Sequence, residues 1–144
     1  MRVGFIKVRR LQMKKITKPA AKKKAYKAFQ MYLRTLWTTS GQSQCYTCDR
    51  YYGFSNIQVG HWVTGHNNAV YINEDYVRPQ CKGCNIFQGG RQGEFRDRLR
   101  KELGDEVVDF LLKASREKVD ITVSDYQEME AWYRQQKELL DNQR

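Results

Sequence analysis

Two Cys-x-x-Cys pairs constrain the fold of this chain more than any other feature. The first pair is Cys45 and Cys48, and the second is Cys81 and Cys84, with 32 residues (49–80) between the pairs. Each pair can present two thiolates to one ion, and two such turns complete a closed tetrahedral zinc site with no position open for a substrate. A redox-active pair is the competing interpretation, but the second pair and the lack of a thioredoxin-like strand pattern disfavour it. The sequence therefore predicts a structural zinc centre.

The length of 144 residues predicts a single domain, which a bound zinc ion would help to stabilise. We expect a basic N-terminal arm over residues 1–18 and one domain over residues 19–144. That domain divides by charge and apolar spacing into a basic helix (19–38), a zinc-bound core (42–93) and a helical C-terminal part (94–144). The expected fold class is α+β.

The zinc-bound core is expected to contain short extended segments. Apolar residues favour strands at 57–63 and 69–72, and the Gly- and Asn-rich segment 65–68 is typical of a turn between them. The sequence thus predicts a hairpin that the zinc holds against a following helix.

The C-terminal part is predicted to be helical. One helix over 94–103 ends at Gly104, a common C-terminal stop, and a second covers 105–118. A third is expected to begin after Ser124, because Ser124 and Gln127 approximate a capping box. These helices are expected to act as a scaffold.

The positive charge is concentrated in the N-terminal third. Residues 1–48 hold 12 Lys and Arg and no Asp or Glu, whereas residues 49–144 hold 14 basic and 16 acidic residues, which gives +10 overall. Such a field is typical of a protein that binds a polyanion. Within the amphipathic segment 20–37, five cations lie on the polar side: Lys22, Lys23, Lys24, Lys27 and Arg34. A solvated charged face is the alternative, but the absence of acids favours DNA phosphate binding.

Composition also argues against membrane insertion and secretion. No stretch approaches the roughly 18 apolar residues that a spanning helix needs, and the N-terminus lacks the apolar segment of a secretory signal. Cysteine pairs of this kind are more often zinc ligands than disulfides in a reducing compartment. We therefore expect a cytoplasmic protein without a membrane partner.

The residues around the cysteine pairs suggest a catalytic site. His61 lies on an expected strand after the first pair, and Asn85 directly follows the last cysteine. In a zinc-bound hairpin that leads into a helix, the end of the strand and the first turn of the helix face each other across a small cleft. A histidine there can take a proton from water, and an oxygen ligand opposite can hold Mg²⁺ against a scissile phosphate. Such constellations hydrolyse phosphodiesters.

This arrangement resembles the HNH, or ββα-metal, nucleases of the four-cysteine subtype. The order of motifs is similar to that of the NinG/Rap family of phage recombination endonucleases, which share a G-H-F/W step, a P-Q-C-x-x-C-N block and a G-x-x-x-E-[YF]-R segment. Here these correspond to residues 60–62, 79–85 and 90–96. The similarity extends from Phe29 to the C-terminus.

The resemblance implies a zinc-stapled ββα-metal centre and a divalent-metal endonuclease that cuts branched recombination DNA, such as Holliday junctions and D-loops, in a bacterial host cell. By position, His61 would be the general base and Asn85 a ligand of a catalytic Mg²⁺ or Mn²⁺. The near-two-fold symmetry of a four-way junction makes a homodimer attractive. A recombination protein is considered as a further partner.

Two positions depart from the family pattern. Gly60 lies where many HNH proteins have a metal-binding acid or histidine, and Tyr76 lies where the middle asparagine is usual. Asn73 is therefore assigned to the catalytic site, where it is expected to brace the loop, with Asn67 and Asn68 as alternatives.

Four further residues complete the predicted site. His66 is either an additional ligand of the catalytic metal or an ordinary loop residue. Arg78 is assigned to the catalytic site as a phosphate contact, with a surface charge as the alternative. Lys82 and Arg91 flank the cleft and are expected to contact the DNA backbone.

Two other functions fit the sequence. A zinc-stabilised DNA-binding module that has lost the chemistry is favoured by Gly60 and Tyr76, and it predicts salt-dependent binding without cleavage. A zinc-ribbon adaptor that binds protein or RNA is the second alternative, and the basic N-terminal third disfavours it unless its partner is acidic.

Overall fold

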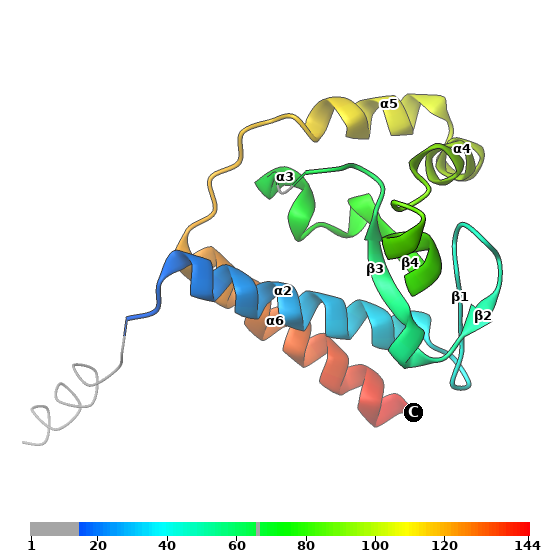
Figure 1. Cartoon of the computed structure of the whole chain (residues 1–144). Helices are drawn as coiled ribbons and strands as arrows, with labels where there is room; N and C mark the ends of the chain where they lie inside the picture. Colours follow the sequence, from blue (N-terminus) through cyan, green and yellow to red (C-terminus); the bar gives the residue numbers. More distant parts are fainter. Residues whose placement is uncertain (1–14, 66) are drawn as a thin grey trace, which may run out of the picture.

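The structure is a computed structural model that describes residues 15–65 and 67–144, and it combines helices with two small antiparallel sheets (Figure 1). The expected mixture of helix and strand is therefore confirmed. Most of the predicted N-terminal arm, residues 1–14, lies outside the described residues. The main elements are α2 (Lys18–Trp37), β1 (Ser43–Gln44), β2 (Tyr51–Tyr52), β3 (Ile57–His61), α3 (Asn68–Tyr71), β4 (Val77–Cys81), α4 (Gln92–Leu103), α5 (Asp105–Ala114) and α6 (Val123–Gln143).

Helix α2 forms where the basic helix is predicted. The Thr17 side chain accepts a hydrogen bond from the backbone N–H of Ala20 and caps the helix, and Pro19 occupies its first turn. Buried residues recur along one face at helical spacing, including Ala25, Phe29 and Leu33. This face packs against α6, which lies alongside α2 over much of its length (Figure 1).

Helix α6 begins earlier than predicted. Its capping box is formed by Thr122 and Asp125, not by Ser124 and Gln127, because the side chain of each contacts the backbone N–H of the other. Tyr133 of α6 meets Phe29 of α2 edge to face, with ring centroids 5.2 Å apart. The α2–α6 pair therefore forms the larger of the two main hydrophobic cores.

Strand β3 pairs with β4, not with residues 69–72. The antiparallel register places Ile57 opposite Cys81 and His61 opposite Val77. The prediction of a strand over 69–72 is wrong, since residues 68–71 form the short helix α3, whose N-terminus is capped by the side chain of Asn67. The connection between β3 and β4 thus carries α3 and a 3₁₀ turn, η2 (Glu74–Tyr76).

Helices α4 and α5 cover the end of the molecule opposite α2 and α6 (Figure 1). Helix α4 ends at Gly104 as predicted, where the φ angle of +89° favours glycine. Helix α5 ends at Ala114, four residues before the predicted end at residue 118. Buried side chains from both helices pack with the β3–β4 connection in a second core: Trp62, Val70, Tyr76, Phe95, Leu99 and Val108.

Candidate metal centre and active site

The four cysteine sulfurs form one cluster at the base of the β3–β4 hairpin. Cys45 and Cys48 lie in the turn between β1 and β2, Cys81 ends β4, and Cys84 lies in the π-helical turn η3 (Gly83–Phe87). All four sulfur atoms lie within 4.8 Å of one another, and those of Cys48 and Cys81 are 3.9 Å apart. A tetrahedral zinc ion bound at about 2.3 Å would space its sulfurs by about 3.8 Å. The predicted cysteines therefore come together and could hold a zinc ion.

Backbone groups around Cys45 favour its thiolate form. The N–H of Cys81 donates to the sulfur of Cys45 at 3.3 Å, and the N–H of Cys84 donates to that of Cys81 at 3.4 Å. Burial acts to raise the pKa of Cys45, but hydrogen bonds from Cys81, Cys48 and Thr47 outweigh it and lower the pKa to about 6, whereas burial raises the pKa of Cys84 to about 12. The donor set is all sulfur, largely buried and closed, which suits a structural zinc ion.

A buried glutamine connects the cysteine cluster with the strand that carries His61. Gln80 is fully buried, and its Nε2 donates to Thr47 Oγ1 at 3.1 Å and to the carbonyl oxygen of Gly90 at 2.9 Å. Thr47 Oγ1 in turn lies 3.6 Å from the sulfur of Cys45. A Cβ atom on Gly60 would lie 2.1 Å from Gln80 Oε1. Packing therefore explains the glycine at position 60, because Gln80 fills the space that a larger side chain would need.

His61 ends β3 with its ring half-buried in an aromatic stack. Its Nε2 lies 3.0 Å from the carbonyl oxygen of Tyr71, and its ring is nearly parallel to that of Tyr71, with centroids 5.9 Å apart. Tyr26 of α2 stacks on Tyr71 at 4.3 Å. A carbonyl oxygen only accepts hydrogen bonds, so Nε2 carries the proton in the neutral ring and the lone pair lies on Nδ1. The ring is thus held in the tautomer that can take a proton at Nδ1.

His61 and Asn85 line the same hollow, which has a volume of about 370 Å³. Asn85 lies in η3, directly after Cys84, and its Nδ2 donates to Gln58 Oε1 at 2.9 Å. Because Gln58 holds the nitrogen, the oxygen is the atom that the Asn85 amide can offer to a cation. Gln92 Nε2 donates to the carbonyl oxygen of His61 at 3.1 Å, which ties the start of α4 to the end of β3. The two residues with predicted catalytic roles therefore share one site.

The loop between β3 and β4 is braced by asparagines. Asn73 accepts from the backbone N–H of Asp75 and donates to the carbonyl oxygen of Ala69, so it holds the loop internally, at the start of η2. Asn67 and Asn68 donate to the carbonyl oxygens of Ser115 and Val119, which tie the loop to the segment between α5 and α6. These contacts are structural, and none of the three asparagines is among the residues that line the His61 hollow.

Two other residues of this loop bear on the predicted site. Tyr76 is buried, and its hydroxyl donates to the carbonyl oxygen of Leu111 at 2.8 Å, so this position serves packing against α5. His66, predicted as a further metal ligand, lies outside the described residues.

Three predicted phosphate contacts have protein partners. Arg34 donates to the carbonyl oxygens of Ile57 and Phe54 at 2.8 Å, so it fastens α2 to the start of β3. Arg78 pairs with Glu102 at 3.4 Å, and Arg91 pairs with Glu94 at 3.1 Å. Burial lowers the pKa of Arg34, while Glu94 raises that of Arg91. Arg34 therefore stabilises the fold. Arg78 and Arg91 form exposed ion pairs, which contribute little to the free energy of unfolding.

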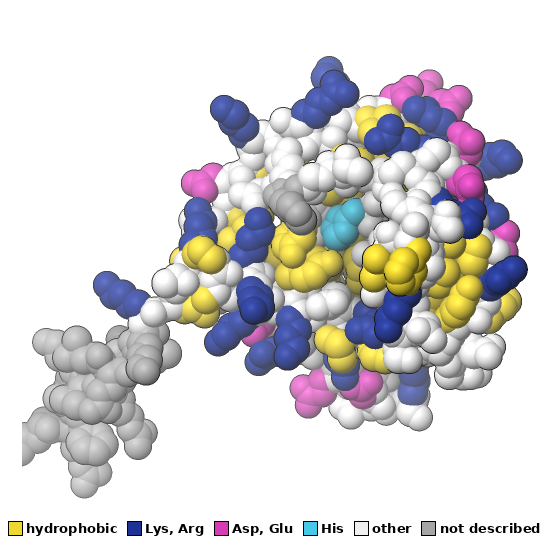
Figure 2. Space-filling view, in the orientation of Figure 1, with side chains coloured by type: hydrophobic (Ala, Val, Ile, Leu, Met, Phe, Trp, Pro, Cys, Tyr) yellow, Lys and Arg dark blue, Asp and Glu magenta, His cyan; other side chains and the backbone are white. Residues whose placement is uncertain are grey.

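Lysines remain the cations best placed for a phosphate near the site. Lys82 lines a second hollow of about 360 Å³ that shares Asn85 with the first. Lys22 contacts the loop, because its amine donates to Asn68 Oδ1 at 3.2 Å and lies 4.9 Å from the Tyr71 ring centroid. Figure 2 shows the histidine (cyan) at the surface beside hydrophobic side chains, with Lys and Arg (dark blue) on the same face and acidic side chains toward its edges.

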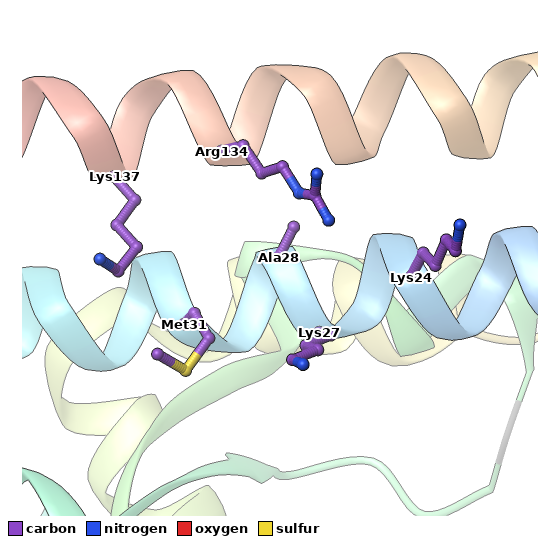
Figure 3. Close-up of a pocket in the computed structure, with 6 residues that line it drawn as sticks. All are labelled: Lys24, Lys27, Ala28, Met31, Arg134 and Lys137. Atoms are coloured by element: carbon purple, nitrogen blue, oxygen red, sulfur yellow. The ribbon is translucent and has the colours of Figure 1, made fainter.

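The remaining predicted lysines lie farther round α2. Lys23 is exposed on this helix, and Lys24 and Lys27 line a groove between α2 and α6 together with Arg134 and Lys137 (Figure 3). The two α6 cations had not been predicted, since they are embedded in an acid-rich segment and only the packing of α6 on α2 brings them to the lysines.

Comparisons with known proteins follow this geometry. None of the helices in the described part of the chain is long and apolar enough to cross a membrane. Comparison with curated proteins and with solved structures gave no match. The sequence profile described as Bacteriophage Lambda NinG protein matches residues 4–143, which is nearly the whole chain. The chain therefore belongs to the NinG family, which is described by the NinG protein of bacteriophage lambda.

Proposed function

We propose that this protein is a structure-selective DNA endonuclease that hydrolyses phosphodiesters in branched recombination intermediates with a divalent metal. One observation carries the proposal: His61 and Asn85, which lie 24 positions apart in the sequence, line the same hollow beside the cysteine cluster. A base and an oxygen ligand that line one hollow are the two groups that metal-assisted phosphodiester hydrolysis requires.

The arrangement of elements supports an assignment to the ββα-metal type. Strands β3 and β4 form an antiparallel hairpin, and the helical turn η3 follows β4 directly. His61 ends the first strand and Asn85 lies in the turn, as in the HNH order of motifs. In this proposal the zinc-bound cysteines hold the turn against the hairpin, and Asn85 is positioned by its neighbour Cys84.

Different residues of the chain have different roles in the proposed hydrolysis. The carbonyl oxygen of Tyr71 holds the proton on Nε2 of His61, so that Nδ1 accepts a proton from the attacking water. Gln58 orients the Asn85 amide so that its oxygen faces a bound Mg²⁺ or Mn²⁺. When bound, that ion supplies electrostatic stabilisation of the charge that develops on the phosphate. Lys82 binds a neighbouring phosphate in the adjoining hollow.

Branched DNA is the proposed substrate because backbone contacts cannot read sequence. Helix α2 contains no Asp or Glu, and its lysines offer phosphate contacts that position a duplex without specifying bases. Recognition would then rest on the shape of the junction, and a homodimer would match the near-two-fold symmetry of a four-way junction. We also propose that the protein acts in the cytoplasm of a bacterial host, with or without a recombination protein as its partner.

A non-catalytic DNA-binding module of the same fold is the second candidate. Gly60 and Tyr76 favour it, because they occupy positions where many HNH proteins have functional side chains. Both residues have packing roles here, Gly60 against Gln80 and Tyr76 against α5. A protein that retained only binding would keep these packing roles without needing His61 and Asn85 in one hollow.

Cleavage assays separate the two candidates. Purified protein is incubated with a labelled four-way junction or a matched linear duplex, in Mg²⁺, in Mn²⁺ and in EDTA. The endonuclease proposal predicts metal-dependent cutting of the junction and little cutting of the duplex. Tight, salt-dependent junction binding with no cutting in either metal would overturn it in favour of the DNA-binding module.

A further inference from the structure

A cation-lined groove lies between α2 and α6, separate from the His61 hollow. It has a volume of about 340 Å³, and its six lining residues include no Asp or Glu. Figure 3 shows Lys24 and Lys27 on α2, both to the same side of Ala28, with Arg134 and Lys137 extending from α6 toward α2. Met31 completes the wall on the α2 side. Four cations from two helices thus converge on one small concave surface.

The charge distribution of α6 makes this groove unusual. Helix α6 carries five acidic residues but only two basic ones, and both basic residues line the groove that faces the lysines of α2. Packing that maximised attraction between the helices would place the acids there instead. Like charges brought together on adjacent helices repel one another, and a bound anion removes that cost. The arrangement therefore suits an anionic ligand better than it suits helix pairing.

Intramolecular ion pairs leave the groove available. Arg134 pairs with Glu130 and Lys137 pairs with Asp141, both on α6 itself at i, i+4 spacing. The Arg134 side chain is 70% exposed although that of Glu130 is only 17% exposed, and the Lys137–Asp141 pair lies at the surface, so both cations can still contact a further anion. Within the described part of the chain, Lys24 and Lys27 form no salt bridge with an acid.

The groove and the catalytic hollows lie on neighbouring sides of α2. Tyr26, Gln30 and Arg34 face the hollow shared with Asn85, whereas Lys24, Lys27, Ala28 and Met31 face the groove. At 100° per residue, the mean directions of the two sets differ by about 110° around the helix axis. The exposed strip between them carries Lys23, and the whole of α2 lacks acids. Lys22 lies over the ring of Tyr71, which lines the His61 hollow, whereas Lys24 and Lys27 line the groove. Helix α2 therefore presents lysines toward two diverging directions.

We infer that the α2–α6 groove binds the phosphodiester backbone of a second DNA arm, while the first arm lies across the His61 hollow. This inference rests on the proposed function, because it names how the same protein would recognise a branch. A linear duplex follows one direction and reaches one of the two surfaces. A branched DNA sends arms in two directions, so that it engages both. The groove thus contributes to selectivity for branched over linear DNA.

The test measures binding in EDTA, so that its outcome does not depend on cleavage. The groove variant is Arg134→Gln with Lys137→Gln, and the matched control is Lys113→Gln with Arg116→Gln, two exposed cations of α5 and the segment after it. Both variants lose two positive charges. Affinity for a four-way junction and for a linear duplex is measured by fluorescence anisotropy over a series of salt concentrations, with thermal melting as a check of folding.

The groove variant is expected to weaken junction binding about 10- to 30-fold near physiological salt, and to lower the slope of log affinity against log salt by about 2, because each phosphate contact contributes about 0.9. Duplex binding is expected to change about threefold or less, as is junction binding by the control variant. Equal losses in groove and control variants, or equal losses for junction and duplex, would overturn the inference.

Two results distinguish DNA binding by the groove from the endonuclease proposal and from binding of an acidic protein. Junction binding that depends on the groove, without cleavage by the wild-type protein, would leave the inference standing and refute the endonuclease proposal. If poly-L-glutamate changed the signal of a fluorescent probe attached beside the groove but junction DNA did not, the groove would bind an acidic protein, and the inference would be wrong.

Discussion

The cysteine cluster and the His61 hollow are adjacent in the chain, yet they are built in opposite ways. The cluster is closed, because four sulfurs within 4.8 Å face one another and backbone N–H groups surround them. The hollow is open, and its polar atoms come from half-buried side chains on β3 and η3. The two meet at Cys84 and Asn85, consecutive residues of one turn. Consecutive side chains of a single turn therefore belong to the cysteine cluster and to the His61 hollow.

This contrast predicts that substitutions in the cluster affect stability, and that substitutions in the hollow affect activity. A cluster variant that changes only activity, or a hollow variant that changes only stability, would show that the two regions are not separate in function.

Loss of zinc is expected to have the largest effect. Withdrawing the metal with a chelator, or replacing Cys84 by Ser, should unfold the hairpin region, since structural zinc sites contribute on the order of 10 kcal/mol to folding in small domains. Thermal melting followed by circular dichroism, together with a metal assay, checks this. As a control, chelation of the Cys84→Ser variant should cause little further change. A zinc-free protein that melts like the wild type would contradict a structural role.

Asn85→Ala is expected to reduce cleavage by about 100-fold or more while leaving the fold intact, because it removes the oxygen proposed to hold the catalytic metal. Cleavage rates are measured as a function of Mg²⁺ and Mn²⁺ concentration. Gln58→Ala is the matched control, since it breaks the same Asn85–Gln58 hydrogen bond from the other side and keeps the Asn85 oxygen. Because Gln58 also orients the Asn85 amide, Gln58→Ala should lose some activity, but less than Asn85→Ala. Cleavage by Asn85→Ala at the wild-type rate would contradict the proposed role of its oxygen.

Gly60→Ala is expected to destabilise the protein by about 1–3 kcal/mol, because the new Cβ would meet Gln80 Oε1 at 2.1 Å. The free energy of unfolding in urea measures this cost. Gln80→Ala removes the clash along with two hydrogen bonds of Gln80, so the double variant should be less destabilised than the sum of the single variants, by about 0.5–3 kcal/mol. Additive effects would show that Gln80 is not what excludes a side chain at position 60.

The smallest effect is expected at the start of α6, far from both regions. The backbone N–H of Thr122 donates to Asp125 at 2.8 Å and, with the Thr122 side chain, lowers the pKa of Asp125. A depressed carboxyl pKa contributes stability above the ordinary Asp value, and this contribution is lost as the pH falls through the folded-state pKa. Asp125→Asn should therefore flatten the acid side of the stability profile slightly. An unchanged profile would mean that the capping box carries no such contribution.

Much of the frame is predictable from sequence because its signals are local. The two Cys-x-x-Cys pairs predict the sulfur cluster through their spacing, and the acid-free amphipathic segment predicts α2. Gly104 predicts the end of α4, since a backbone position with positive φ favours glycine. The association of His61 with Asn85 follows from the motif order, and both residues line one hollow.

Other features depend on contacts that no local pattern reveals. Residues 69–72 are apolar enough for a strand, but the Asn67 cap and the burial of Val70 favour helix α3. The true partner of β3 contains Pro79, which disfavours a central strand but is tolerated in a two-stranded sheet. Arg34 looks like a surface cation in sequence, yet two backbone carbonyl groups distant in the chain bind it.

The most direct test of the central claim is the rate of junction cleavage by His61→Ala, measured beside the wild type with zinc content and junction affinity determined on the same preparations. A general base contributes about 10²- to 10⁴-fold to the rate, so the variant should lose that much activity while retaining one zinc ion per chain and wild-type binding. Cleavage at the wild-type rate would contradict the assignment of His61 as the base and, with it, the proposed site.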